Sequence, residues 1–310
     1  MANEVPQFSV ATPTRNALDK LRRCVGSVRG QTEVRVEHLV QDACSSDGTA
    51  AWLAAQRDQD GALLAVSEAD AGMYDAINRA WARSRGQYLS WLNADEQYLP
   101  GTLDRVEAVF AAHPQIEVLF ANYLVVDAKG LAVALRCEIP LRRFLVANTF
   151  LNAQSCTLFF RRSLLERGLL QLDPCLRYAA DMELALRLLK HGVRFLHVDE
   201  VWSLFGIDGG NLSTHPGAVI ETERVARAHG ALAWKPLRIT AMAARRSERL
   251  LRGAYGKRDL TYAYATSEVP EYVTLSARAL GGRYSLDNPR GHAEIVAPQA
   301  PASFERGAQQ

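Results

Sequence analysis

The sequence has no long uninterrupted hydrophobic run and almost no excess of charge of either sign. Its 36 Lys and Arg residues are balanced by 34 Asp and Glu residues, and a net charge of +2 does not indicate nucleic acid as a partner. The longest uncharged stretch, residues 144–160, is interrupted by polar side chains, which argues against a membrane-spanning helix. These absences leave a globular protein of ordinary composition.

Cysteine is also scarce. The five cysteines form no C-x-x-C pair and no metal-like spacing, and their number is odd: they are Cys24, Cys44, Cys137, Cys156 and Cys175. The pattern predicts reduced thiols in or near the core. The first ten residues, MANEVPQFSV, carry an acidic residue where a signal peptide carries positive charge, and no long apolar segment follows them. A cytoplasmic location is therefore expected.

Short apolar runs alternate with amphipathic segments along the first part of the chain. Strands are predicted at residues 7–11, 34–40, 63–66 and 87–92, and the segments between and after them have helical spacing. This alternation predicts an α/β fold with a doubly wound, Rossmann-like and mostly parallel sheet flanked by helices.

The pattern becomes mixed beyond residue 115. Residues 116–126 predict a strand pair, 158–160 and 194–198 predict single strands, and 181–190 predict a helix. From Pro216 onward the strand alternation is lost, and the sequence predicts helices followed by a polar tail. The chain is accordingly divided into a domain of residues 1–215 and a C-terminal helical extension of residues 216–310.

Polar side chains follow the predicted strands directly, among them Thr12, Asp42, Asp70 and the pair Asp95-Glu96. Ligands of open α/β sheets bind beyond the carboxyl ends of the strands, so these residues are expected to converge on one crevice. Adjacent carboxylates repel each other unless a cation offsets their charge. Hard divalent cations prefer oxygen ligands from one or two carboxylates, water and a diphosphate. Asp95, helped by Glu96, is therefore a candidate metal ligand, and a solvated turn is the alternative.

Five stretches occur in an order that is typical of one enzyme family: TPTRN (12–16), DACSSDGT (42–49), SEADAGMYDAINRA (67–80), LNADE (92–96) and RYAADMELALRL (177–188). Over roughly residues 7–215 the chain resembles the family 2 inverting glycosyltransferases with a GT-A fold. The resemblance implies a nucleotide-diphospho-sugar donor, with a UDP-sugar favoured, and a divalent metal, Mn or Mg. It also implies a hydroxyl acceptor on a glycan or lipid-linked glycan, in cell-surface polysaccharide biosynthesis.

The resemblance assigns roles to the first two loops. It implies that Asp42 binds the nucleotide base and that Thr12 and Pro13 belong to the donor site. A loop cap is the alternative for Asp42, and a cap of the following helix is the favoured interpretation of Asp47.

The next two stretches are expected to contact the donor and the metal. Asp70, Asp75 and Asn78 would run along the nucleotide and its sugar, although favourable charge at a helix start also explains the two acids. In LNADE the first acid of the family's D-x-D motif is replaced by Asn93. The resemblance then implies that Asn93 orients ribose or water, that Ala94 lines the same loop, and that Asp95 holds the metal.

Asp181 stands where the family keeps its catalytic base, and a helix cap is the alternative from the residues alone. In an inverting transfer a carboxylate takes the proton of the acceptor hydroxyl, while the metal and nearby donors stabilise the departing nucleoside diphosphate. Residues 205–213 resemble the glycine-containing segment that closes over the diphosphate. His215 follows this segment, and its role is left open between a surface residue and a ligand.

Residues 235–258 predict a basic amphipathic helix, which is typical of contact with an anionic membrane surface. A helix docked on the protein or on a partner in a homodimer is the alternative.

Other functions were considered for the whole chain. A sugar-nucleotide nucleotidyltransferase requires a glycine-rich loop after the first strand, and TPTRNALDK contains no glycine. A catalytically silent nucleotide-binding or scaffold protein stays open because of Asn93, and a glycoside hydrolase has the least support.

Overall fold

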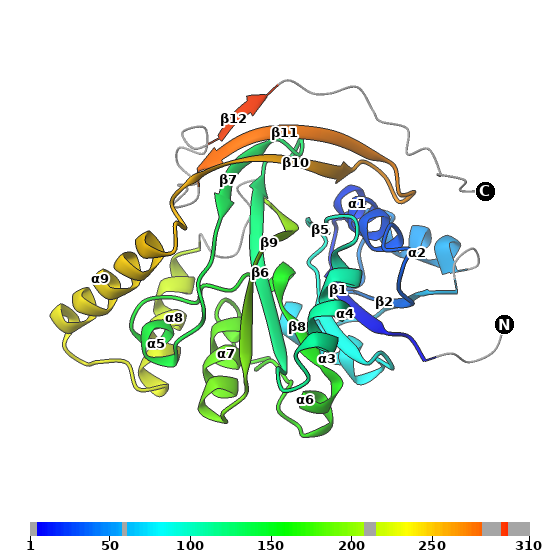
Figure 1. The fold of residues 1–310 in the computed structure, drawn as a ribbon. Helices are drawn as coiled ribbons and strands as arrows, with labels where there is room; N and C mark the ends of the chain where they lie inside the picture. Colours follow the sequence, from blue (N-terminus) through cyan, green and yellow to red (C-terminus); the bar gives the residue numbers. More distant parts are fainter. Residues whose placement is uncertain (1–4, 58–60, 208–214, 281–292, 297–310) are drawn as a thin grey trace.

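The computed structural model describes residues 5–57, 61–207, 215–280 and 293–296 (Figure 1). Its main sheet contains β1 (Phe8–Thr14), β2 (Val36–Asp42), β3 (Leu63–Ser67), β4 (Tyr88–Trp91), β5 (Glu96–Tyr98), β6 (Val118–Val126), β7 (Ala132–Arg136), β8 (Phe159–Arg161) and β9 (Phe195–Gly206). The strand order is β3-β2-β1-β4-β8-β6-β9-β5, and β7 is a further, antiparallel partner of β6.

The four strands β3, β2, β1 and β4 are parallel neighbours, which confirms the predicted α/β alternation. Every residue of β1 and β4 is buried, as expected for parallel strands covered on both faces. Beyond β4 the sheet is mixed, because β8 runs antiparallel to both β4 and β6. The strand pair predicted within residues 116–126 is instead the single strand β6, and β7 supplies its antiparallel partner.

Helices cover both faces of this sheet (Figure 1). Trp81 and Leu184 lie in one buried cluster, and Cys24 and Phe110 lie in another. These residues belong to α3 and α7 on one face and to α1 and α4 on the other, which gives a three-layer arrangement. The elements are α1 (Leu18–Arg29), α2 (Thr49–Arg57), α3 (Met73–Ala82), α4 (Thr102–Ala112), α5 (Arg143–Asn148), the 3-10 turn η1 (Ser155–Thr157), α6 (Arg162–Glu166) and α7 (Ala180–Lys190).

The C-terminal region is helical only in its first part. The helices α8 (Pro216–Ala228) and α9 (Lys235–Leu251) agree with the prediction. The expectation of a polar tail after them is wrong for residues 257–280, which form the antiparallel pair β10 (Lys257–Ala265) and β11 (Tyr272–Leu280), joined by β12 (Ala293–Val296). The sequence does contain the pattern of a strand here, because Leu260, Tyr262 and Tyr264 alternate with polar or small residues. In the structure the buried Tyr262 faces the body of the protein.

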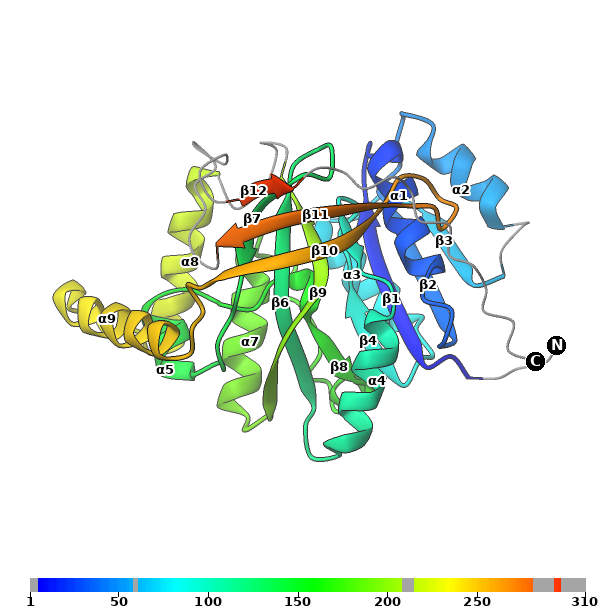
Figure 2. The same ribbon diagram turned by 45° about the horizontal axis from the view of Figure 1, so that its top comes forward.

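Residues 257–280, here called the C-terminal strap, cross the molecule from β7 to α1 (Figures 1 and 2). The Gln97 side chain accepts from the Ala265 N–H at 2.8 Å and donates to the Ala265 carbonyl at 3.2 Å. The Tyr262 hydroxyl donates to the Gly130 carbonyl at 2.8 Å. These bonds tie the strap to β5 and to the turn between β6 and β7.

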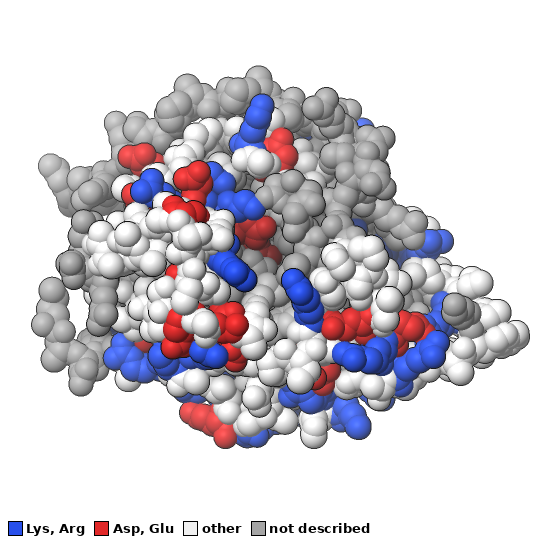
Figure 3. Space-filling model, turned by 180° about the vertical axis from the view of Figure 1, so that it is seen from behind, with Lys and Arg blue, Asp and Glu red and all other residues white. Residues whose placement is uncertain are grey.

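Charges of both signs are interspersed on the surface. On the face seen in Figure 3, acidic and basic side chains lie next to each other rather than gathering by sign. Among the described residues, Arg79 pairs with both Glu68 and Asp75, and Arg187 pairs with Glu183. Such pairs at the surface contribute about 1 kcal/mol or less each, so their main effect is to keep the surface mixed in charge.

Candidate active site

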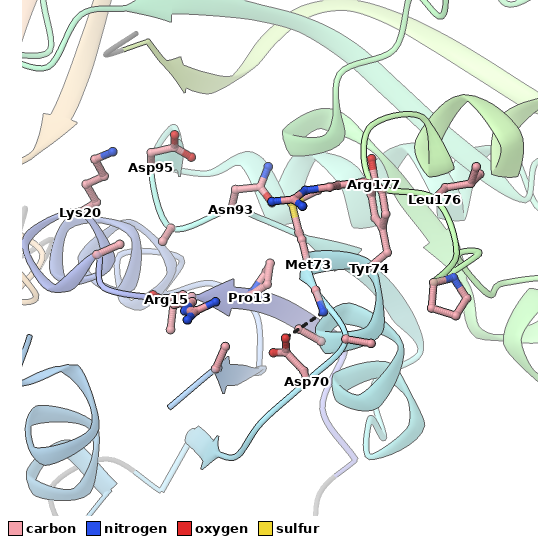
Figure 4. A pocket seen from close by; sticks show the side chains of 18 of the residues that line it. Pro13, Arg15, Lys20, Asp70, Met73, Tyr74, Asn93, Asp95, Leu176 and Arg177 are labelled. Atoms are coloured by element: carbon pink, nitrogen blue, oxygen red, sulfur yellow. Dashed lines mark hydrogen bonds between the residues drawn. The ribbon is translucent and has the colours of Figure 1, made fainter. Parts of the chain in front are cut away.

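A pocket of about 710 Å³ lies at the carboxyl ends of β1 and β4 (Figure 4). Its walls come from the loop after β1, the first turn of α1, residues 70–76, the loop 93–95 and residues 174–177. The chain leaves β1 toward β2 on one side of the sheet and returns to β4 on the other, so the pocket occupies the switch point at which α/β sheets bind ligands. The predicted site residues Pro13, Asp70 and Asp95 meet there.

The loop between β4 and β5 supplies Asn93, Ala94 and Asp95 to the pocket wall. Asn93 Oδ1 is buried and has no hydrogen-bond partner among the described residues, while its Nδ2 lies 3.5 Å from Ser155 Oγ. A buried amide oxygen without a donor is unusual and indicates a missing partner. Together with the Asp95 carboxylate it offers the hard oxygen ligands that a divalent cation prefers.

Glu96 follows Asp95 in the sequence but points into the protein. Its side chain is fully buried, and it accepts from the Asn93 N–H at 2.8 Å and from the Ser155 hydroxyl at 2.9 Å. Burial, reinforced by the nearby charge of Asp95, raises the pKa of Glu96. The expectation that Glu96 serves as a metal ligand is therefore not supported by its placement, because both of its carboxylate oxygens accept hydrogen bonds inside the protein. Glu96 instead fixes the loop that carries Asn93 and Asp95.

Three cationic side chains line the same pocket, and sequence reasoning did not select them as site residues. In Figure 4, Lys20 and Asp95 lie at one end, Arg15 stands near Pro13, and Arg177 enters from the loop before α7. Arg15 and Arg177 lie within quoted motif stretches, and Lys20 lies one helical turn beyond the first. The motif stretches therefore already contained two of these three cations, Arg15 and Arg177. Cations around a pocket of this size suit a ligand that carries several negative charges.

Asp42 and Thr12 are both buried behind the pocket rather than in its wall. The Asp42 carboxylate accepts from the Ser45 N–H at 3.1 Å and from the Ser45 and Ser67 hydroxyls at 2.5 Å. Thr12 Oγ1 lies 2.8 Å from His38 Nε2. The loop-cap alternative for Asp42 thus describes its contacts in this structure, and its contact with a nucleotide base stays a prediction.

Asp47 has the capping role that was favoured for it. Its carboxylate accepts from the Thr49 N–H at 3.1 Å and the Thr49 hydroxyl at 2.6 Å, at the start of α2. It also accepts from the Leu18 N–H at 3.0 Å, at the start of α1. One carboxylate therefore caps two helices, and the hydrogen bonds from Thr49 and Leu18 lower the pKa of Asp47.

The segment before α3 contributes Asp70 to the pocket, but not Asp75 or Asn78. Asp75 accepts from the Ala71 N–H at 3.0 Å and pairs with Arg79, which lowers the pKa of its carboxyl. Asn78 donates to the Leu172 carbonyl at 2.7 Å and accepts from the Leu172 N–H at 2.9 Å. The predicted donor contact of Asn78 is therefore replaced by a structural role: it anchors the chain just before residues 174–177 of the pocket wall.

Asp181 lies at the start of α7, behind the pocket wall and next to Tyr74. Tyr74 lines the pocket, and the backbone of Ala180 and Asp181 lies close to its hydroxyl. The Asp181 carboxylate accepts from the Met182 N–H at 2.8 Å. Burial is the main cause that raises the pKa of Asp181 to about 6. A carboxyl with this pKa is ionised at neutral pH and retains proton affinity, as a general base requires.

His215 is the N-cap residue of α8, where its Nδ1 accepts from the Gly217 N–H at 3.1 Å. Its ring stacks on Tyr178 with centroids 5.0 Å apart. Of the glycine-containing segment 205–213, residues 208–213 lie outside the described residues. Gly206 packs against the Asp95 loop so closely that a Cβ there would lie 2.4 Å from the Asp95 carbonyl oxygen, so β9 can approach this loop only with glycine at that position.

Comparison with known proteins agrees with this architecture. The chain matches the model of Glycosyl transferase family 2 over residues 9–169. The succinoglycan biosynthesis protein ExoO of Rhizobium meliloti is 27% identical over 222 residues, which cover 68% of this chain and 64% of ExoO, slightly less than two thirds of its length.

Two solved structures share the fold. TarS of S. aureus, residues 1–349 in complex with UDP-GlcNAc, has a TM-score of 0.57 at 19% identity, over 79% of this chain and 73% of that one. The mannosyltransferase PcManGT from Pyrobaculum calidifontis, in complex with GDP-Man and Mn²⁺, has a TM-score of 0.53 at 18% identity, over 80% of this chain and 76% of that one.

The mixed α/β sheet, flanked by helices and similar to that of TarS, defines the fold class as that of the GT-A glycosyltransferases. The family match extends over half of the chain, and the chain belongs to glycosyl transferase family 2, a family of glycosyltransferases.

Proposed function

We propose that this protein transfers a sugar from a nucleotide-diphospho-sugar to a hydroxyl of a glycan acceptor, with inversion at the anomeric carbon. The observation that carries the proposal is the strand-end pocket in which the Asp95 carboxylate and the orphaned Asn93 oxygen share a wall with Arg15, Lys20 and Arg177. Oxygen ligands beside cations match the needs of a metal-bound diphosphate.

The donor is a UDP-sugar on this proposal, with Mn²⁺ or Mg²⁺ held by Asp95. Among the described residues no group of three or more His, Cys, Asp or Glu side chains is placed to hold a metal. This agrees with a site in which the protein supplies one carboxylate, with Asn93 Oδ1 beside it, and the donor diphosphate supplies the remaining oxygens. Pro13, Ala94 and Asp70 are proposed donor contacts. TarS is described with UDP-GlcNAc and PcManGT with GDP-Man and Mn²⁺, which supports a nucleotide-sugar and a metal.

In the proposed reaction Asp181 takes the proton of the acceptor hydroxyl as its oxygen attacks the anomeric carbon. A new C–O bond forms on the face opposite the leaving group, and the bond from the anomeric carbon to the diphosphate breaks, with its electron pair leaving on the nucleoside diphosphate. A divalent metal held by Asp95, with Asn93 Oδ1 beside it, would neutralise charge on the diphosphate. Lys20, Arg15 and Arg177 stabilise the additional negative charge of the leaving group through fixed positive charges around the pocket.

The proposed acceptor is a glycan or lipid-linked glycan of cell-surface polysaccharide biosynthesis. The name of ExoO, a succinoglycan biosynthesis protein, supports this substrate class. We place the reaction in the cytoplasm, peripherally on the inner face of the membrane. Among the described helices, none combines the length and the apolar character that crossing a bilayer requires.

The helix α9 is the proposed membrane contact, but its geometry differs from the prediction. Arg245 and Arg249 are buried, with 1% and 3% exposure, rather than displayed on the surface. The outward face instead carries apolar side chains, among which Ile239 is 69% exposed and Leu250 is 68% exposed, with Arg246 beside them. An exposed apolar stripe flanked by a cation suits the interface of a bilayer.

Nucleotide binding tests the catalytic proposal. Thermal stabilisation of the protein is measured with UDP, GDP, dTDP and CMP, each with and without Mn²⁺, beside the variants Asp95→Asn and Asp181→Asn. We expect Mn²⁺-dependent stabilisation by UDP, because a ligand that binds only the folded state raises its stability. The effect is lost in Asp95→Asn and kept in Asp181→Asn, which binds the donor but does not transfer its sugar. A protein that responds to no nucleotide contradicts the proposal and favours the scaffold function.

Vesicle sedimentation tests the membrane contact. We expect the protein to sediment with vesicles that contain anionic lipid, and the double variant Ile239→Ser, Leu250→Ser to stay in the supernatant. The control is Val269→Ser, which removes an apolar side chain of the strap that is 52% exposed. Equal sedimentation of all three proteins contradicts the assignment to α9, and a concentration-dependent dimer lost in the double variant assigns the stripe to a second copy.

A further inference from the structure

The carboxylate of Glu221, on α8, is a common acceptor for three consecutive backbone N–H groups of the turn before α7. The Arg177 N–H lies 2.9 and 3.0 Å from its two oxygens, and the N–H groups of Tyr178 and Ala179 lie 2.5 and 2.8 Å from Oε2. Successive N–H groups that converge on one point form a nest, a natural site for an anion. Here the anion is supplied by the chain itself, and the Glu221 side chain is only 12% exposed.

The turn that Glu221 holds has two functional ends. Its first residue, Arg177, projects its side chain into the pocket (Figure 4), and Asp181 follows two residues after the turn. The N-cap residue of α7 is Ala179, whose side chain offers no acceptor. Glu221 accepts from the N–H of this N-cap residue and from the two N–H groups before it, so it fixes the direction in which the helix begins.

A second contact joins the same two segments. The rings of Tyr178 and His215 stack at an interplanar angle of 9°, and a Cβ at Gly217 would lie 2.9 Å from the Tyr178 ring. The start of α8 is thus packed directly on the turn. Close packing of this kind transmits a displacement of α8 to the turn.

We propose that Glu221 is a positioning residue of the active site, which holds Arg177 at the donor pocket and Asp181 beside it in one rigid turn. This inference rests on the proposed function, because it takes Asp181 as the base. It adds a residue outside the matched motifs, and it couples α8 to the reaction: any movement of α8 displaces a donor contact and the base together.

The charge of Glu221 gives the proposal a second, independent signature. Among the described residues, Tyr74 from α3 and Glu221 from α8 are the titratable groups of neighbouring elements that act on Asp181. Tyr74 stays neutral because burial raises the pKa of its hydroxyl. The negative charge of Glu221 adds to burial in raising the pKa of Asp181. Removing this charge lowers that pKa.

The test compares Glu221→Gln and Glu221→Ala with Glu223→Gln, a matched loss of charge on the same helix that faces Arg227 and Arg238 instead. The pKa of Asp181 is read without any ligand from the ¹³C carboxyl signal of Asp-labelled protein, assigned with Asp181→Asn. Glu221→Gln retains an acceptor oxygen, so we expect a folded protein whose Asp181 titrates at lower pH. Glu223→Gln leaves the titration in place.

Turnover is followed as UDP release from UDP-glucose, UDP-galactose and UDP-N-acetylglucosamine. In Glu221→Ala we expect the rate to fall on the order of 10- to 100-fold, because misplacement of catalytic groups by about 1 Å has this effect. We also expect weaker stabilisation by UDP with Mn²⁺, through Arg177. If Glu221→Ala does not fold, Glu221→Gln still decides the question through its titration and its pH–rate profile.

The outcomes separate this inference from the proposed function. If Asp181→Asn is inactive while the Glu221 variants keep the wild-type titration and rate, only the positioning role is overturned. If Asp181→Asn turns over donor like the wild type, the proposed base is wrong whatever the Glu221 variants do. A titration of Asp181 that shifts in Glu223→Gln as much as in Glu221→Gln also overturns the positioning role, because the effect is then one of general charge.

Discussion

At the scale of single residues, Asp181 illustrates a conflict between stability and activity. Its folded pKa of about 6 lies above the ordinary value of an aspartate. As the pH rises from about 4 to about 6, the unfolded state ionises first, so this carboxyl increasingly disfavours folding. We expect Asp181→Asn to abolish transfer and to raise the free energy of unfolding by up to about 3 kcal/mol above pH 6. Urea unfolding at pH 4 and pH 7.5 measures this difference, which is much smaller at the lower pH.

The same pKa predicts how the wild-type rate depends on pH. The base acts in its deprotonated form, so kcat/KM is expected to rise with pH through an apparent pKa of about 6 and then to level off. The measurement is a pH–rate profile of UDP release at saturating metal. A rate that is flat between pH 5 and pH 8 would contradict the assignment of the base to this carboxyl.

Single residues also show where sequence reasoning ends. The strand alternation places Asp42, Asp95 and Glu96 at strand ends, and the structure agrees. The direction of each side chain depends on partners that are far away in the chain: Glu96 turns inward to Ser155, 59 residues later, and Asn78 turns to Leu172, 94 residues later. Such partners become known only with the fold. The sequence could therefore predict which residues lie at the strand ends, but not the contacts that each side chain makes.

At the scale of elements, α9 is an amphipathic helix whose cations face the protein. Arg249 Nη1 donates to Glu138 Oε2 at 2.8 Å, and Arg136 lies 3.3 Å from the other oxygen of that carboxylate. Arg245 stacks on Phe150 at 3.7 Å. The spacing of the sequence predicted a basic helix here, and that was correct. It did not reveal which face is buried, because the counter-charge is 111 residues away.

This buried pair predicts a large loss of stability. We expect Glu138→Gln to lower the free energy of unfolding by about 3–5 kcal/mol, because Arg249 is then left in the interior without its counter-charge. The control is Glu248→Gln, whose partners Arg142 and Arg252 are about half exposed, and which costs about 1 kcal/mol or less. Urea unfolding of both variants measures the difference. Equal losses would mean that the Arg249 pair is solvated rather than buried.

At the scale of the whole molecule, the C-terminal strap closes the structure by joining segments from opposite ends of the chain. Arg29 of α1 donates to the Glu268 carbonyl at 3.1 Å, across 239 residues. The strap thus buries the outer side of β7 and covers α1, so the 216–310 extension contributes to the stability of the first 215 residues. The first part of this extension was recognisable from helical spacing. The contact between the strap and α1 could not be recognised in the sequence, because residues so far apart in the chain leave no local pattern.

Gly26 lies where the C-terminal strap crosses α1, and this contact reverses the usual effect of Gly→Ala on stability. In the interior of a helix, Gly→Ala ordinarily stabilises by about 1 kcal/mol. A Cβ at Gly26 would lie 2.0 Å from the Ser267 carbonyl oxygen, which is backbone and cannot rotate away. We therefore expect Gly26→Ala to destabilise by about 1–3 kcal/mol and to speed amide exchange in β10 and β11. In Gly61→Ala, where a Cβ meets no atom within 4 Å, stability should stay nearly unchanged. A Gly26→Ala protein with a higher melting temperature would show that the strap does not rest on α1 in solution.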